Sequence, residues 1–237
     1  FKVYSPEIIA VHTTCLSETI DDDLTQIVSK AHEDGCVPAG KTVIHCNTPS
    51  YVGSHITGFS NMVKGMVKYL SKNEGKSNGK LNVIPGFVNP ADMREMKRIL
   101  KAVGTEFIMF PDTSGVLDAP MTGKYDMYPA GGTKIEELVD AGNSTATIAL
   151  GSFASAEGAY ELNKKCKVPA AVLKTPIGIE ATDKFLMEIS KFTGKPIPYE
   201  LEEERGQVVD VMVDCHYHYH GKKVAIFGDP DLVIALT

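Results

Sequence analysis

The sequence lacks several patterns that would fix its class at once. Its five cysteines include no CxxC pair, so neither a disulfide framework nor a self-contained zinc site is indicated. No apolar run approaches the roughly 20 residues that a helix needs to cross a bilayer, and no signal peptide opens the chain. We therefore expect a cytoplasmic protein without a membrane partner.

Nucleotide-binding fingerprints are missing as well. GxGxxG follows none of the expected strands, and GxxxxGK followed by Ser or Thr occurs nowhere, which argues against a nucleotide bound by this chain. The formal net charge of −6 argues against nucleic acid as the main partner, because phosphate binding needs a concentrated basic face. An acidic surface would rather suit a basic protein partner.

What the chain does contain is a regular alternation of strand-like and helix-like segments. Short apolar runs are followed by stretches with helical periodicity, in a chain that is 43% hydrophobic and 23% charged. This order predicts an α/β fold of Rossmann-like domains, with parallel sheets flanked by helices. We expect strands at 8–11, 41–46, 81–87, 105–110, 145–150 and 169–174, and helices at 24–34, 59–70, 91–103, 135–140, 156–165, 183–192 and 200–219.

The segment 71–80 (SKNEGKSNGK) is polar, contains glycine and has no periodicity, which is the composition of a linker. We place a domain boundary there. Residues 1–75 are expected to form the end of one α/β domain and residues 81–198 a second. Residues 199–237 are expected to form a connecting helix and the start of a third.

Two further segments give specific expectations. The loop 111–133 is longer than about 15 residues, which marks it as functional or mobile. The run KKVAIFGDPD at 222–231 is expected to open a new strand–helix unit, and the helix before it to bury Val208, Val209, Met212 and Val213. Both chain ends are abrupt, so the sequence is expected to be a fragment.

The chemistry centres on a cysteine near the start of the chain. Ile8 to Val11 form a continuous apolar run, which predicts a strand buried on both faces of a parallel sheet. Cys15 follows at the carboxyl end of that strand, where open parallel sheets bind their ligands. The other four cysteines are expected to be inert thiols, because no special position singles them out.

A second loop is expected at the same sheet edge. The strand at 41–46 runs into NTPSYVGSH, which carries Ser50, Ser54 and His55. Because the carboxyl ends of parallel strands meet at one edge, this loop should lie close to Cys15.

The helix at 200–219 carries two further candidates. Asp210 and Asp214 are spaced i, i+4 and so project from one face, where they would supply part of a calcium-like or iron site or form a solvated acidic stripe. The run CHYHYH at 215–220 is a weaker metal candidate, because alternate residues diverge on a helix.

Six strings, in their order and spacing, resemble the nitrogenase molybdenum-iron protein family and in particular its beta subunits. The resemblance runs through the whole chain and covers about the middle half of a subunit built from three α/β domains. The strings are TTCLSETIDDDL, NTPSYVGSHITGF, NVIPGF, VLDAPMTGKYDMYPAGGT, ERGQVVDVMVD and FGDPD.

The resemblance implies roles for particular residues. Cys15 is implied as a ligand of the P-cluster, an 8Fe-7S cluster shared with the alpha subunit, and Ser50 as a ligand of its oxidised form. Asp210 and Asp214 are implied to contribute to an iron or calcium ion between two beta subunits. The resemblance also implies that the acidic turn after Cys15 faces the iron protein, with Asp22 and Asp23 as candidate contacts.

The resemblance also implies an activity. Nitrogenase is an ATP-dependent oxidoreductase of nitrogen fixation, whose ultimate electron donor is a reduced ferredoxin or flavodoxin. Its iron protein passes electrons to the P-cluster, which relays them to the iron-molybdenum cofactor of the alpha subunit for reduction of dinitrogen to ammonia. The chain would therefore act in an alpha2beta2 heterotetramer and contribute no catalytic residue of its own.

Two alternatives remain open at this point. A non-catalytic scaffold of the same superfamily would assemble the cofactor, and a metal-free, doubly wound protein would bind a small molecule. One position departs from the family, because Asp21 stands where glycine is usual. Glycine at a turn indicates a positive φ, so we expect a positive φ at Asp21. Two further cluster cysteines of the family precede Phe1.

Overall fold

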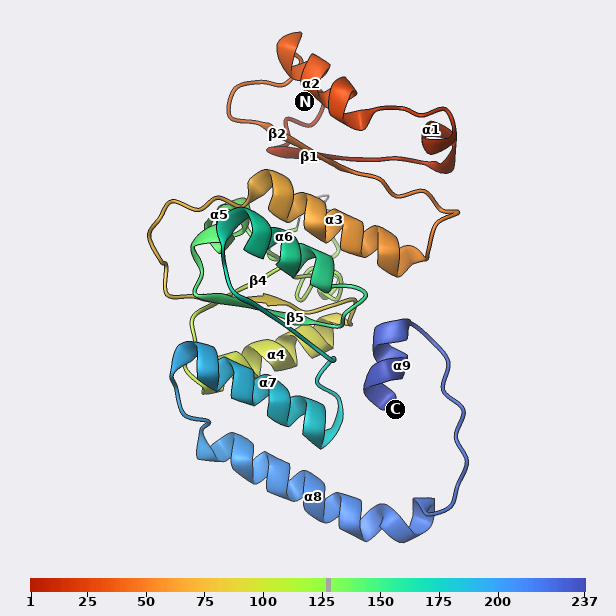
Figure 1. Ribbon diagram of the computed structural model, residues 1–237, viewed down its shortest axis with the longest axis vertical. Coiled ribbons are helices and arrows are strands. Elements are labelled where there is room, and N and C mark those ends of the chain that lie inside the picture. Colours follow the sequence, from red (N-terminus) through yellow and green to blue (C-terminus); the bar gives the residue numbers. More distant parts are fainter. Residues whose placement is uncertain (127–128) are drawn as a thin grey trace.

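The computed structural model describes residues 1–126 and 129–237, and it has an α/β architecture with two separate parallel sheets (Figure 1). The alternation of strands and helices predicted from the sequence is confirmed. Residues 127 and 128, which fall in the long loop expected at 111–133 and in one of the resembling strings, lie outside the described residues.

The first sheet has two strands. β1 (Ile8–His12) pairs in parallel with β2 (Thr42–Cys46), and the connection between them contains α1 (Cys15–Thr19) and α2 (Leu24–Glu33). The position of β1 confirms the prediction, but burial on both of its faces is wrong. Its residues are half-buried or exposed. In this two-stranded sheet β1 is an edge strand with β2 on one side only, so part of its surface stays open to solvent.

The turn before α2 has the positive φ expected at Asp21, where the resembling family usually has glycine. Asp21 has φ 61°, in the left-handed region that glycine adopts more readily. Asp23 is the N-cap of α2, and its carboxylate accepts a hydrogen bond from the Gln26 amide at 3.0 Å. The acidic turn therefore also starts a helix.

The second sheet has the strand order β4-β3-β5-β6, all parallel. β5 is buried along its whole length, as a continuous apolar run in a parallel sheet predicts. The strands are β3 (Leu81–Ile84), β4 (Phe107–Met109), β5 (Ala146–Leu150) and β6 (Ala170–Leu173).

Helices cover both faces of this sheet (Figure 1). On one face α4 and α7 bury Met93 and Phe185 against the strands, and on the other α3 and α6 bury Val67 and Leu162. The helices are α3 (His55–Leu70), α4 (Pro90–Ala102), α5 (Ile135–Asp140), α6 (Ala156–Cys166) and α7 (Gly178–Thr193). A 3-10 turn at Ala141–Asn143 follows α5 directly.

The segment expected to be a linker has no helix or strand, but it is held in place. The Ser71 hydroxyl donates to the Leu138 carbonyl at 2.8 Å, and the Asn78 amide group donates to the Asp140 carbonyl at 3.1 Å. The helix before it, α3, packs on α6 and shares a core with the second sheet. The division into domains at this segment stays a prediction.

The C-terminal part differs from two expectations. α8 (Tyr199–Tyr219) buries Leu201 in its first turn, whereas its predicted buried side, which includes Val208 and Met212, is largely exposed. The strand expected after residue 222 is absent from the described chain, because no neighbouring strand is there to pair with its backbone. The helix predicted after GDPD is confirmed as α9 (Pro230–Leu236).

Candidate functional site

Cys15 lies where β1 ends and α1 begins. Thr14 is the N-cap of α1. Its backbone amide donates to the Ser17 hydroxyl at 2.7 Å, and the Ser17 amide donates to the Thr14 hydroxyl at 3.4 Å. This capping box fixes the backbone on either side of the cysteine. The Cys15 side chain is half-buried and remains a free thiol.

The structure brings Cys15 and Ser50 together across the edge of the first sheet. The Cys15 sulfur is in direct hydrogen-bonding contact with the Ser50 hydroxyl. The Ser50 amide also donates to the same sulfur, at 3.3 Å. Sequence analysis placed both residues at one sheet edge, and their proximity is confirmed.

The hydrogen bonds change the acidity of the thiol. The Ser50 hydroxyl, and after it the Ser50 amide, stabilise the thiolate and hold the pKa of Cys15 below its ordinary value. Burial raises the pKa of Cys46 and of Cys166 instead. Cys15 is therefore better suited to be a metal ligand than these two thiols, since the thiolate is the form that ligates.

A pair of threonines holds the two loops at this spacing. The Thr48 amide donates to the Thr13 hydroxyl at 2.7 Å, and the Thr48 hydroxyl donates to the Thr13 carbonyl at 3.0 Å. Thr13 is buried. Sequence analysis did not single out either residue, although both lie directly beyond the ends of β1 and β2, where such a cross-link is possible.

Removing the Ser50 hydroxyl should make the Cys15 thiol less acidic. In Ser50→Ala the hydrogen bond from the residue 50 amide to the Cys15 sulfur remains, but the hydroxyl, which stabilises the thiolate more, is lost. The pKa of Cys15 therefore rises, and a smaller fraction of the thiol is ionised at neutral pH. We expect slower iodoacetamide labelling of Cys15 near pH 7 and a labelling profile shifted to higher pH, read by mass spectrometry on the cluster-free full-length subunit. The exposed Cys36 is the internal reference. An unchanged Cys15 profile would contradict this assignment.

The remaining predicted residues fall into two separate places. Asp22 is exposed beside the Cys15 loop, and Asp23 is committed to capping α2. Asp210 and Asp214 are exposed on α8, at the opposite end of the molecule (Figure 1). In residues 1–126 and 129–237, no three His, Cys, Asp or Glu side chains gather into a metal site, so this pair would need donors from outside the described residues.

The surface around Cys15 is unusually apolar for an exposed region. Leu16 and Ile20 on α1 are 69% and 62% exposed, and Tyr51 and Val52 beside Ser50 are 60% and 54% exposed. Contiguous exposed apolar residues of this kind mark interaction sites.

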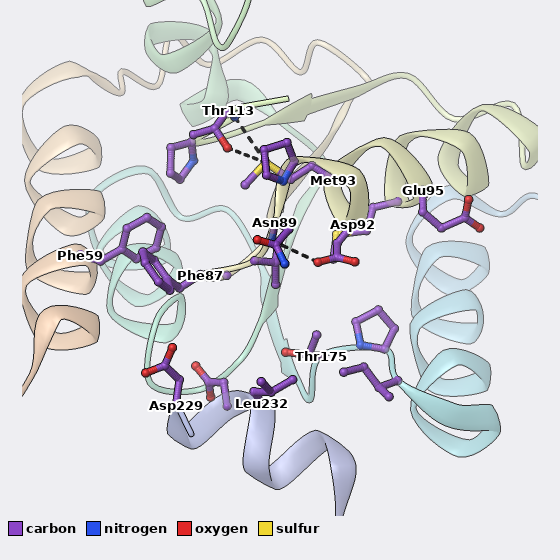
Figure 2. Close-up of a pocket in the computed structure, with 18 of the residues that line it drawn as sticks. Phe59, Phe87, Asn89, Asp92, Met93, Glu95, Thr113, Thr175, Asp229 and Leu232 are labelled. Carbon is purple, nitrogen blue, oxygen red and sulfur yellow. Dashed lines mark hydrogen bonds between the residues drawn. The ribbon is translucent and has the colours of Figure 1, made fainter. Parts of the chain in front are cut away.

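The described part of the chain also contains a cavity of about 600 Å³ at the carboxyl edge of the second sheet (Figure 2). Phe59, Phe87 and Met93 line it, and these are residues that sequence analysis did not assign to a site. The Asp92 carboxylate, which also faces it, accepts the Asn89 amide at 3.1 Å. The cavity is therefore mainly apolar, and it lies apart from the first sheet's Cys15 edge.

One side of this cavity is closed by α9. Asp229 pairs with His55 of α3 at 3.1 Å, and His55 also lies edge-on to Phe87 with ring centroids 5.2 Å apart. The Asp231 carboxylate accepts the amides of Phe153 and Ala154 at 3.1 and 2.9 Å. The GDPD sequence thus fastens the last segment to the loop after β5.

No helix in the described ranges combines the length and apolar character that a membrane span requires. This agrees with the hydropathy of the sequence.

Comparison with known proteins gives a consistent result. The family model of nitrogenase component 1 type oxidoreductases matches residues 1–237. The nitrogenase molybdenum-iron protein beta chain of Clostridium pasteurianum is 62% identical over 237 residues, which are 100% of this chain and 52% of that relative. The corresponding beta chain of Azotobacter vinelandii is 40% identical over 240 residues, covering 99% of this chain and 46% of that relative.

Solved structures agree. Nitrogenase Cp1 at pH 6.5 matches with a TM-score of 0.96 and 62% identity, over 100% of this chain and 52% of that one. A chain of nitrogenase Cp1 at pH 5 matches with a TM-score of 0.58 and 19% identity, over 90% of this chain and 39% of that one, which shows the fold alone. The chain spans about half the length of the curated relatives it matches. It belongs to the nitrogenase component 1 type oxidoreductases.

Proposed function

We propose that this chain is part of a nitrogenase component 1 beta subunit and supplies one corner of its P-cluster. The observation that carries the proposal is the Cys15–Ser50 pair, in which a thiol of lowered pKa contacts a hydroxyl at a sheet edge. Family membership, which implies metal–sulfur clusters, supports it. The relatives' names include molybdenum and iron, which favours the molybdenum type.

The donor set suits such a cluster. Thiolates are the standard ligands of iron–sulfur clusters, and the Cys15 sulfur is accessible enough to bond to a group outside the chain. When bound, the cluster would store and pass on single electrons. Cys15 would hold it through sulfur, and Ser50 would ligate only after its Oγ releases a proton, so that proton loss at Ser50 accompanies oxidation.

The partners follow from the incompleteness of this site. One cysteine cannot hold a cluster, so the remaining ligands must come from other parts of the subunit and from an alpha subunit across the shared cluster. The exposed apolar residues around Cys15 support an interface there. In the proposed alpha2beta2 assembly, electrons arrive from the iron protein and leave toward the cofactor of the alpha subunit, where dinitrogen is reduced to ammonia.

Asp210 and Asp214 are proposed to hold an iron or calcium ion together with a second beta subunit. Their i, i+4 spacing on α8 supports this, because it directs two hard oxygen donors to one side. The exposed apolar residues of the same helix, which include Val211 and Met212, support a partner surface that would cover the pair.

The acidic turn is proposed as a docking contact for the iron protein. Asp22→Lys should weaken docking about two- to fivefold at low salt, because exposed ion pairs contribute about 0.2–1 kcal/mol each. The effect should shrink at high salt, since the Debye length is about 8–10 Å near physiological ionic strength. Binding of the iron protein to the full-length assembly, measured over a salt series, checks this.

The control separates docking from folding. Asp23→Asn keeps an N-cap for α2 while removing a charge, whereas Asp23→Lys would also remove the cap bond to Gln26. Asp23→Asn should therefore weaken docking without lowering the thermal stability. Equal salt dependence for Asp22→Lys and the unmodified assembly would remove the docking role.

Anaerobic purification of the full-length protein with its alpha subunit tests the proposed function. An iron-loaded assembly that accepts electrons from the iron protein is expected. An iron-loaded assembly without electron transfer would favour the scaffold alternative. A colourless, iron-free assembly would favour the small-molecule-binding alternative, for which the cavity of about 600 Å³ would be the site.

A further inference from the structure

The helix that carries Cys15 is attached to the loop after β2 at two points. The Cys15 sulfur contacts the Ser50 hydroxyl, and the Asn47 side-chain amide donates to the Glu18 carboxylate at 2.7 Å. Cys15 and Glu18 are three residues apart on α1 and so share one face of that helix. Asn47 and Ser50 are also three residues apart. A single contact would leave α1 free to pivot, whereas two contacts fix its orientation.

Packing contributes little to the placement of α1. All five of its residues are described, and the side chain of none of them is buried. Glu18 is half-buried, and its carboxylate is a charged acceptor, which makes a stronger hydrogen bond than a neutral acceptor does. The orientation of α1 therefore depends on its polar contacts, of which the Glu18–Asn47 bond is one.

Asn47 is itself held by a well-packed helix. The Asn61 side-chain amide of α3 donates to the Asn47 carbonyl at 2.9 Å, and α3 shares a core with the second sheet. The next residue, Thr48, is tied to Thr13 through its amide at 2.7 Å. Without this support the bond to Glu18 would be one more surface hydrogen bond. With it, Glu18 connects α1 to the packed part of the molecule.

We propose that Glu18 is a positioning residue for the Cys15–Ser50 pair. Through Asn47 it fixes the orientation of α1, and with it the separation between the Cys15 sulfur and the Ser50 hydroxyl. The consequence for a cluster rests on the proposed function, because it requires that Cys15 hold iron. The consequence for the separation does not, since the chain itself makes both contacts.

Disulfide formation between Cys15 and position 50 reports the separation directly. In full-length protein that carries Ser50→Cys, prepared without its cluster and equilibrated in a glutathione redox buffer, the disulfide-bonded fraction gives the effective concentration of the two thiols. Adding Glu18→Ala should lower this effective concentration about two- to tenfold, since one hydrogen bond to a charged group is lost at an exposed site. Mass spectrometry of the linked peptides provides the measurement.

Matched variants separate positioning from a general loss of stability. Glu18→Gln keeps an acceptor oxygen and should retain most of the effective concentration. Asn47→Ala should lower it as Glu18→Ala does, and the two together should lower it no further, because they remove the same bond. Glu33→Ala, the same change at an exposed position of α2, should have no effect.

In iron-loaded assemblies that retain Ser50, Glu18→Ala should alter the electron paramagnetic resonance signal of the oxidised cluster and Glu18→Gln should leave it unchanged. An effective concentration in Glu18→Ala equal to that in Glu33→Ala, or an equal loss in Glu18→Gln, would overturn the positioning role. If Cys15 proves to hold no iron, the proposed function fails while the disulfide result still decides the positioning. If Glu18→Ala fails to fold, Asn47→Ala decides, because it removes the same bond and leaves the sequence of α1 intact.

Discussion

Replacing Cys15 by Ala in the full-length assembly is expected to lower its iron content and to slow electron transfer by about tenfold or more. The reason is that the substitution removes the proposed cluster ligand, and even changes to outer neighbours of a metal site cost 10–100-fold. Iron per tetramer, and the rate of electron transfer from the iron protein, provide the measurement.

Cys36→Ala is the matched control for Cys15→Ala. Cys36 is exposed beyond the end of α2 and contacts neither Ser50 nor the threonine pair, so the same chemical change there should leave iron and activity unchanged. Wild-type iron content and wild-type rates in Cys15→Ala would refute the ligand assignment.

The second large effect is expected from Thr13. Thr13→Val keeps the side-chain shape but removes the buried hydroxyl that accepts the Thr48 amide. Leaving a fully buried donor unsatisfied costs about 1–3 kcal/mol, and the Thr48 amide is partly buried, so a cost toward the lower end is expected. We expect the two loops to separate, which lowers the thermal stability and changes the electron paramagnetic resonance signal of the oxidised cluster. The spectrum is the informative measurement, because a purely structural role would not alter it in the molecules that remain folded.

Thr13→Ser provides the control. Serine retains the hydroxyl at the same position, so the Thr48 bond and the spectrum should both be preserved. A Thr13→Val assembly with the wild-type spectrum and reduced stability would show that the threonine pair supports the fold without positioning Cys15 or Ser50.

The sequence predicts well those features that depend on local pattern. The strands of the second sheet read as continuous apolar runs because both faces of that sheet are covered, and β5 is buried throughout. The meeting of Cys15 with Ser50 could be predicted because the carboxyl ends of parallel strands share an edge. The backbone at Asp21 was also predictable, because a turn position where glycine is usual favours a positive φ, and Asp21 has φ 61°.

Other features depend on contacts that no local pattern specifies. The apolar side of α8 is readable as a periodicity, but the partner that would cover it is not, and Val208 and Met212 are exposed. The apolar run at 224–227 has the pattern of a strand, and yet it pairs with no strand in the described chain. The Thr13–Thr48 cross-link depends on the register between β1 and β2, which emerges only in three dimensions.

X-ray diffraction from the full-length assembly at the iron absorption edge would locate the iron relative to Cys15. If Cys15 is a ligand, an anomalous peak is expected within iron–sulfur bonding distance of its sulfur, with Ser50 beside the same cluster. Iron density that leaves Cys15 as a free thiol hydrogen-bonded to Ser50 would contradict the assignment of Cys15 as a ligand.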